Sequence, residues 1–479
     1  MIADPPFWRN VILGRARYNS MGSLSSSMWI ASEALGADQG ALDATANNIA
    51  NQNTPGYTRE VAVLSEAAPT VEGNVTYGNG VVLQQIQSVR DQVLQIQISD
   101  QNQQQGSAQA QYSAMQQVQG LFSNPTTGIG ADTTAFFNSI SQLSTDPASI
   151  PDRQAVLTAA QTVASDFNST ERNLDSIQSG LNQSVGQTVI QINTLTQQIA
   201  QLNVQVGQMQ QLGQDPGNLG DQETQLIQQL SQLTNVNQIQ TENGLTLTTG
   251  NGTPLVVGGQ SFALQTTNGP AGMTDISSQG QDITSSLQGG QLGGNLQVRD
   301  TVIPGLLSQV DTLASQFATS MNAAQASGYD LNGNVGQPLF SDTSGAGAAS
   351  NLKVAITDPS LIAASSDGTQ GSNGNVANLL AVQTQALPSG ETPVDAYANL
   401  VSQTGNLASQ ANAEVTASTA SLNQLNDQLG SVSGVNLDEE TTNLMNYQRA
   451  YEAAARVITT VDELTQSVLD MGSGVTAAP

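Results

Sequence analysis

The sequence predicts a mainly α, elongated protein, with coiled-coil helices at its two ends, a long helical bundle or hairpin domain between them and a small inserted β unit. Near the start of the chain, apolar residues recur at every seventh position, namely Met28, Leu35, Leu42 and Ile49. Near the end, Leu437, Leu444, Tyr451 and Ile458 also recur every seventh residue, and Tyr447 and Val461 fall between such positions at steps of three and four, which is the seam of a coiled coil.

These two stripes form a predicted assembly seam. A lone amphipathic helix is marginal in water, because burying one large apolar side chain contributes roughly 1.5–3 kcal/mol while ordering each residue's backbone costs roughly 1–2 kcal/mol. We therefore expect the two ends to pair with each other, with neighbouring subunits, or with both. The alternative is an ordinary antiparallel helix pair that closes a monomeric domain.

The composition also favours an elongated particle over a compact globule. The 479 residues correspond to about three domains. Aromatic residues make up only 4% of the chain and charged residues only 10%, against about 25% charged in typical soluble proteins. Long helices with narrow apolar stripes need few aromatic side chains, whereas an enzyme of this length normally has a richer core.

Charge and residue content exclude several classes of function. The formal net charge is -27 and Lys353 is the single lysine, so the chain lacks the clustered basic residues that bind nucleic acid, and binding to acidic membranes is disfavoured for the same reason. The sequence contains no cysteine and no histidine, which removes common nucleophiles and the usual ligands of zinc. We expect a protein that is not an enzyme and has no catalytic residue, cofactor or metal.

The first residues predict neither a membrane span nor a signal peptide. No stretch of the chain approaches the ~18 apolar residues of a span. The segment with Phe7, Trp8 and Arg9 resembles the basic start of a signal peptide, but the apolar run of residues 11–13 is too short for its core. Because Met21 opens a Met-Gly-Ser sequence that reads like a native start, we expect residues 1–20 to be a non-native or disordered leader.

The rest of the chain divides by its periodicity and its glycines. We expect an N-terminal core helix in residues 21–60, which pairs with residues 435–471, and a C-terminal core helix over residues 435–479. The predicted rod domain comprises residues 61–240, with an extended segment over 61–84, a helix over 89–122, a long helix from Pro151 and a break at residues 213–217, after which a helix folds back.

The second half of the predicted rod contains two irregular regions. Asn243-Gly244 and Asn251-Gly252 indicate hairpins, so residues 241–300 form a small β unit, which is followed by a helix and turn of the rod domain over 301–340. Residues 341–395 are a Gly/Ser/Ala-rich segment with one strand at 352–356, and residues 396–434 return to a rod helix. The glycines of residues 289–294 are expected to make a bend.

Two kinds of possible chemical site have simpler explanations. Residues 330–334 resemble the opening of a calcium loop, but Val335 and Ser341 occupy the positions of the loop glycine and the bidentate glutamate, so we expect a turn. The carboxylate pairs Glu439-Glu440 and Asp462-Glu463 lie on the exposed side or at the start of a heptad helix, where solvated charges are usual.

An asparagine-rich run at the end of the first helix forms a second predicted site. Asparagine is a mediocre helix former, because its amide competes for the backbone. The run could be a frayed, solvated helix end, or its amides could fix the register between packed subunits, as a buried asparagine does in coiled coils. The residues of this predicted register motif are Asn47, Asn48, Asn51, Asn53, Pro55, Gly56 and Tyr57.

Both ends of the chain resemble a known family. Residues 42–60 resemble the amino-terminal signature of the bacterial flagellar rod and hook axial proteins, and residues 435–469 resemble their carboxy-terminal signature. Within that family, residues 56–59, 152–155 and 328–333 are similar to the hook-associated members. The resemblance covers essentially everything after Met21.

The resemblance implies a structural, non-catalytic role at the junction between hook and filament. Expected partners are further copies of the chain in a ring at the hook tip, the hook protein, a second junction protein, a cytoplasmic export chaperone and the type III export apparatus. The implied location is extracellular, on the flagellum, after secretion without a Sec signal. In the family, the two termini are disordered in the monomer and fold together on assembly.

Two departures from the family pattern limit this comparison. Longer members insert an outer β domain where this chain has only residues 341–350, so we expect that domain to be absent or minimal. Glu223 stands where the family commonly has an arginine, so a salt bridge at that position cannot be carried over. The alternatives are a hook or rod structural protein, a coiled-coil surface adhesin, and a peptidoglycan hydrolase carried on the flagellum.

Overall fold

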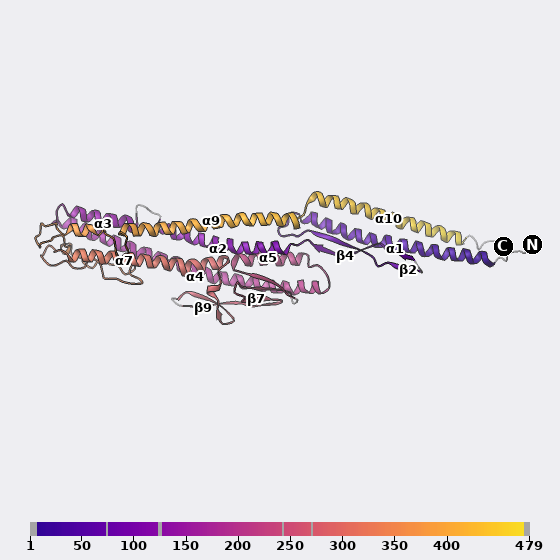
Figure 1. The fold of residues 1–479 in the computed structure, drawn as a ribbon, viewed down its shortest axis with the longest axis horizontal. Coiled ribbons are helices and arrows are strands. Elements are labelled where there is room, and N and C mark those ends of the chain that lie inside the picture. The colour runs from indigo at the N-terminus through magenta and orange to yellow at the C-terminus, as the bar shows by residue number, and fades with distance from the viewer. Residues whose placement is uncertain (1–6, 73–74, 123–126, 242–243, 270–271, 474–479) are drawn as a thin grey trace, which may run out of the picture.

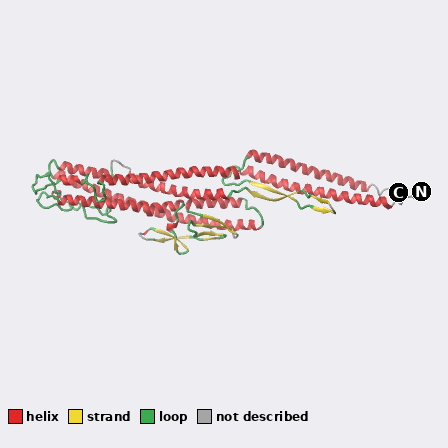
Figure 2. Ribbon diagram, viewed as in Figure 1, coloured by secondary structure: helices red, strands yellow, loops and turns green. Residues whose placement is uncertain are grey.

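A computed structural model of the chain is a long rod of helices, with both termini at one end (Figure 1). It describes residues 7–72, 75–122, 127–241, 244–269 and 272–473. Helices run along the whole length of the rod, and the strands lie in two places on its side (Figure 2). This mainly α, elongated architecture confirms the predicted fold class.

The two terminal helices lie side by side at the end of the rod that carries the termini (Figure 1). Helix α1 spans Phe7–Asn51 and helix α10 spans Leu437–Ser473. The sequence predicts a disordered leader over residues 1–20, whereas the structure starts α1 at Phe7. Residues 1–6 and the side chains that precede Leu24 lie outside the described part.

A β ribbon runs along α1 and fills the predicted extended segment. Strands β1 and β4 pair antiparallel, and the short strands β2 and β3, which lie between them in the sequence, pair antiparallel with each other. Gly80 has a φ of 83°, which favours glycine, and residues 78–80 join β3 to β4, two strands that do not pair with each other. The strands are Glu60–Glu66 (β1), Thr70–Glu72 (β2), Val75–Tyr77 (β3) and Val81–Ser88 (β4).

Long helices form the rod proper. Ser149 caps the longest of them, α4, by accepting a hydrogen bond from the Asp152 N–H, and Pro151 sits in its first turn, as predicted. Gly213 and Gly217 adopt positive φ angles in the predicted break, so α5 folds back onto α4 and α2. The rod helices are Gln92–Phe122 (α2), Ile150–Gln211 (α4), Asn218–Leu233 (α5), Ile303–Ala326 (α7) and Pro393–Ser433 (α9).

The predicted β unit consists of two small antiparallel sheets on the side of α4, with strand orders β5-β6-β7-β8 and β11-β10-β9. The predicted turn at Asn243-Gly244 falls partly outside the described residues, although β5 and β6 on either side of it pair. The strands are Asn237–Thr241 (β5), Gly244–Thr248 (β6), Pro254–Val257 (β7), Gln260–Ser261 (β8), Leu264–Asn268 (β9), Thr274–Ser278 (β10) and Gln281–Asp282 (β11).

The β unit is shorter than predicted because its last residues are helical. After a 3-10 turn at Thr284–Ser286, helix α6 covers Gly290–Gln297 and a π-helical turn covers Val298–Val302. The prediction that residues 289–294 make a bend is therefore wrong. A Cβ on Gly294 would lie 2.3 Å from the Ser107 carbonyl oxygen of α2, so this glycine serves close helix contact.

The far end of the rod contains the main apolar core. Helix α3, Ile129–Leu143, was not anticipated from the sequence and packs there with α4, α7 and α8, Val376–Ala381. A 3-10 turn covers Pro359–Leu361. The predicted strand at 352–356 is wrong, since it reduces to a single bridge between Phe340 and Val354. A second apolar cluster lies between α4 and the β unit.

Candidate assembly interface

The contact between α1 and α10 is built from small side chains. Ala31, Ala37, Ala41 and Ala44 are buried on α1, and a small cavity of about 160 Å³ is lined by Ala41 and Ala44 from α1 and by residues of α10 and β1. Small residues bring helices close but bury little apolar area. Leu35, Leu42 and Ile49 of the predicted seam are only half-buried beside these alanines, and Met28 is exposed.

The residues of the predicted seam on α10 differ in exposure, so they do not all face α1. Val461 is buried, and Leu444, Tyr447 and Ile458 are half-buried, whereas Leu437 and Tyr451 are 41% and 38% exposed. Other large apolar side chains of α10 are exposed as well, namely Met445, Val457, Leu464, Leu469 and Met471. The single chain therefore covers only part of the apolar surface of its C-terminal helix.

Asn48 is the centre of a buried hydrogen-bond network that joins α1, β1 and α10. Its amide nitrogen donates to the Glu60 carbonyl oxygen at 2.8 Å and to the Glu440 carboxylate at 3.0 Å. Its amide oxygen accepts from the Tyr57 hydroxyl at 2.8 Å and from the Glu60 N–H at 2.9 Å. Both amide hydrogens and both acceptor positions are thus used within the chain, which corrects the prediction that Asn48 sets register between subunits.

The other residues of the register motif shape the exit from α1. Asn47 donates to the Glu60 carboxylate at 3.2 Å, and Asn51 donates to Asn47 at 2.8 Å. Gln225 of α5 donates to the Pro55 carbonyl oxygen at 2.7 Å. Gly56 has a φ of 78° and Asn53 is exposed. The residues of the motif therefore form the turn that connects α1 to strand β1.

Arg59 connects the start of the ribbon to the joint between α9 and α10. The Arg59 guanidinium lies 3.1 Å from the Glu439 carboxylate and 4.0 Å from that of Glu440. The backbone N–H of Arg59 donates to the Ser433 carbonyl oxygen at 2.9 Å. Glu440 is 3% exposed, so the prediction that the Glu439-Glu440 pair is solvated is wrong for Glu440. Burial, followed by the charge of Glu60, raises the pKa of Tyr57.

A second polar cluster joins the terminal helices to the rod. Asp221 of α5 accepts from the Thr58 N–H at 2.9 Å and from the Thr58 hydroxyl at 2.7 Å, and it forms a 3.0 Å ion pair with Arg90. Asp215 accepts from the Ser88 hydroxyl at 2.7 Å. Sequence reasoning missed this cluster, because its members come from three separate segments and only the Gly-rich break near Asp215 signals a turn.

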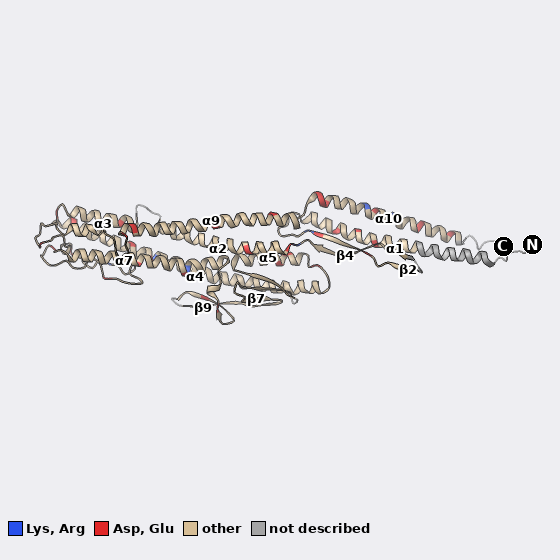
Figure 3. Ribbon diagram, in the orientation of Figure 1, with Lys and Arg blue, Asp and Glu red and all other residues tan. Residues whose placement is uncertain are grey.

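Glu223 lies beside this cluster without a hydrogen bond to its buried Oε1 atom. Loss of solvation raises the pKa of Glu223 to about 7, against the opposing charge of Arg90. Among the described residues no ion pair includes Glu223. Along the described chain as a whole, positions of acidic residues are more frequent than positions of basic residues (Figure 3).

The described residues show no group of three or more acidic side chains placed to hold a metal ion. Asp330 accepts from the N–H groups of Asn332 and Asn334 at 2.8 and 2.9 Å, which makes the predicted turn. In the same described ranges, none of the helices has the length and apolar character needed to cross a membrane.

Family models match three parts of the chain. The model for the flagellar hook-associated protein FlgK helical domain matches residues 115–340. The model for the flagella basal body rod protein matches residues 28–58, and that for the flagellar basal body rod FlgEFG protein C-terminal region matches residues 430–471. The two terminal matches cover the parts of α1 and α10 that form the candidate interface.

Full-length relatives agree with these matches. The flagellar hook-associated protein 1 of Bacillus subtilis is 30% identical over 95% of this chain and 99% of its own length. The protein of the same name from Salmonella typhimurium is 28% identical over 94% of this chain and all of its own length. The solved structure of the flagellar hook junction protein FlgK from Burkholderia pseudomallei superposes with a TM-score of 0.64 at 20% identity, over 70% of this chain and all of that chain.

Proposed function

This chain belongs to the flagellar hook-associated protein 1 family, and from that premise we propose that it polymerises through α1 and α10 to form the junction between hook and filament. As a member of that family it is a structural component of the flagellum, not an enzyme. The observation that carries the proposal is the set of exposed apolar side chains on α10, at the end of the rod where both termini lie.

The interface supports assembly because the single chain leaves its apolar surface uncovered. On α10, Leu437, Tyr451 and Leu464 are between 38% and 49% exposed. Covering such side chains against neighbouring copies would contribute free energy in proportion to the apolar area removed from water. The inward residues, with the Asn48 network, hold α1 and α10 together and present that surface, while Leu437 and Tyr451 contact neighbours.

The remaining parts of the proposal concern partners and location. We propose that copies of the chain form a ring at the hook tip, bound to the hook protein on one side and to a second junction protein on the other. Type III export after escort by a cytoplasmic chaperone would place it outside the cell, without a Sec signal. The family membership and the exposed surface of α10, a natural chaperone target, support these steps.

Gold-labelled antibody on sheared flagella tests the location. A single band of label where hook meets filament is the expected result. Label along the whole hook would instead indicate a hook subunit, label in the basal part a rod subunit, and label absent from flagella would favour the adhesin alternative.

Tyr451→Asp tests the assembly surface, because it places a charge on the exposed face of α10. We expect hooks without attached filaments, while thermal unfolding of the free protein stays unchanged. Gln448→Asp is the matched control, since Gln448 is also exposed on α10 but carries no apolar group to lose. Normal filaments with Tyr451→Asp would contradict the role of this face.

A further inference from the structure

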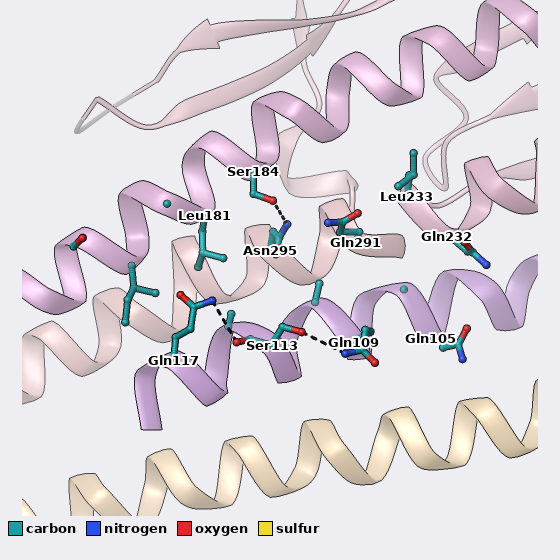
Figure 4. A pocket seen from close by; sticks show the side chains of 16 residues that line it. Gln105, Gln109, Ser113, Gln117, Leu181, Ser184, Gln232, Leu233, Gln291 and Asn295 are labelled. Carbon is teal, nitrogen blue, oxygen red and sulfur yellow. Dashed lines mark hydrogen bonds between the residues drawn. The ribbon is translucent and has the colours of Figure 1, made fainter. Parts of the chain in front are cut away.

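A long groove opens on the rod between α2 and α4, away from the terminal helices. Its volume is about 800 Å³, and its lining comes from α2, α4, α5 and α6. Figure 4 shows Gln105, Gln109, Ser113 and Gln117 along one wall, and Ser184 with Asn295 opposite. Gln109, Ser113 and Gln117 are exposed. The amide nitrogens of Gln109 and Gln117 donate to Ser113, which leaves the two amide oxygens to accept hydrogen bonds from a ligand at the surface.

The groove is uncharged although the chain is strongly acidic. None of the residues that line it is Asp, Glu, Lys or Arg, while the chain has a net charge of -27. Two copies of this protein repel each other through most of their surfaces, and a contact free of carboxylates avoids that cost. The groove therefore fits a neutral polar segment, with amides that both donate and accept hydrogen bonds.

The same chain presents such a segment on strand β9. Leu264 is buried, but the following four residues of β9, Gln-Thr-Thr-Asn, are exposed and neutral. Strand β9 is at the edge of its sheet, paired only with β10. The antiparallel register directs the backbone groups of Leu264, Thr266 and Asn268 to the outer edge. At this edge, the Asn193 side chain donates to the Leu264 carbonyl oxygen and accepts from the Leu264 N–H.

The outer edge of β9 is open beyond Leu264. Within the described part of the chain, the backbone N–H groups of Thr266 and Asn268 have no protein partner. An exposed strand edge is a template for pairing that proteins usually cover or block. The nearest carboxylate, Asp275, lies opposite Thr267 on β10, and it would meet amides rather than carboxylates in the groove.

The groove and the β9 edge are placed for contact between different copies. Ser184 of α4 lines the groove, and Asn193 of α4 forms hydrogen bonds with β9. A step of nine residues along a helix corresponds to about 2.5 turns. Because the extra half turn reverses the direction of the side chain, the groove and β9 lie on opposite sides of α4. Asn182, beside the groove residue Leu181, accepts from the N–H of Thr274, which lies opposite Asn268 of β9, so the groove and this end of β9 are at nearly the same level along α4. The groove wall from Gln105 to Gln117 is ~18 Å long, and β9 from Leu264 to Asn268 spans ~14 Å, so the strand is short enough to lie along that wall.

We propose that the β9 edge of one copy lies in the groove of the next copy around the junction. Such a head-to-tail contact uses two different surfaces and closes into a ring when the rotation permits. The groove glutamines would bond the open backbone groups of Thr266 and Asn268. This inference rests on the proposed ring, and it adds a lateral contact that is separate from the terminal helices.

Filling the groove tests the contact. A Cβ at Gly180, a groove residue of α4, meets nothing within 4 Å, and the same holds at Gly186, which does not line the groove. Gly180→Tyr should therefore fold normally but lower incorporation at hook tips roughly tenfold, a scale typical of single interface residues. Gly186→Tyr should incorporate like the wild type. Equal incorporation of the two variants would overturn the proposal.

Cross-linking tests the pairing directly, because the natural chain has no cysteine. We expect a short bismaleimide to join Gln109→Cys/Thr266→Cys into multimers on isolated hook tips, but not in dilute free protein. Gln109→Cys/Ser141→Cys is the control, with the second cysteine on exposed Ser141 of α3. Absence of multimers from tips that carry the double variant would refute the contact.

Different results would contradict the proposed function and the lateral contact. If the wild-type protein is missing from hook tips in gold labelling, the proposed function is wrong. If it is present there while Gly180→Tyr behaves like Gly186→Tyr and no cross-link forms, only the lateral contact is wrong.

Discussion

The two ends of the rod are built by opposite means. At the far end, large side chains enclose each other, and Phe136, Phe137, Phe167, Phe317 and Phe340 form a network with ring centroids 5.4–6.5 Å apart. At the terminal end, alanines line the contact between α1 and α10, and large apolar residues stay on the outside. The far end is a completed core, whereas the terminal end leaves large apolar side chains exposed, and we propose that other subunits cover them.

The largest expected effect is at the completed core. Phe317→Ala removes a side chain that contacts four other phenylalanine rings, and a cavity of that kind costs about 3–5 kcal/mol. We expect a clear fall in the free energy of unfolding measured with denaturant, with Phe317→Leu losing much less. Equal stability of the alanine variant and the wild type would show that this end is not the stable core.

Asn48→Ala should give the next largest effect, confined to the terminal end. It leaves the 3% exposed Glu440 without the amide donor, and an unsatisfied buried group costs about 1–3 kcal/mol. We expect faster amide exchange in the first turn of α10 and unchanged exchange around Phe317. Asn47→Ala is the control, because Asn47 is exposed, and similar exchange in both variants would remove Asn48 from its central place.

Leu444→Ala should cost less, because Leu444 is only half-buried against α1 in a single chain. Truncating a partly buried leucine contributes about 1 kcal/mol in transferred area. A larger loss in the assembled junction than in the free protein, measured by thermal unfolding of each, would indicate that neighbours bury the residue further. An equal loss in both states would mean that its environment does not change on assembly.

A dependence of stability on pH is expected at Glu223, and it is confined to the pH range in which this group titrates. Its pKa is about 7 in the folded chain against 4.5 for an ordinary glutamate. The folded state therefore holds its proton more tightly, and stability falls as pH rises from about 4.5 to about 7. We expect Glu223→Gln to raise the Tm above that of the wild type at pH 8 but not at pH 4. The exposed Glu452→Gln should show no such difference, and neither variant shifting with pH would contradict the assignment.

Sequence reasoning recovered the elements with long repeats and missed those without them. The periods and breaks around Pro151 and residues 213–217 predicted α4 and α5, because capping and glycine signals act locally. The helices α3 and α6 were missed. Helix α3 does carry a local signal, because its buried residues from Ile129 to Leu143 recur at steps of three and four. Helix α6 has no such signal, since its glycines serve contact with other helices, as Gly294 does with α2.

The pairing of the two ends was predictable, but the exposure of single side chains was not. The heptads predicted that the ends pair, and α1 and α10 lie side by side, while their use in assembly stays a prediction. The heptads did not separate residues such as Val461, which faces α1, from those such as Tyr451, which faces outward. That division depends on which side of α10 packs against α1.

The sequence by itself determined the helical rod, the pairing of its ends, the absence of cysteine and histidine chemistry, and the family, because periodicity, composition and signature motifs are properties of the chain. Only the tertiary structure decided what the polar residues do. Asn48 forms a buried hydrogen bond with Glu440, and Thr58 forms one with Asp221. The β9 edge and the groove lie on opposite sides of α4. Hydrogen bonds between distant segments depend on directions and distances that exist only after the helices have packed.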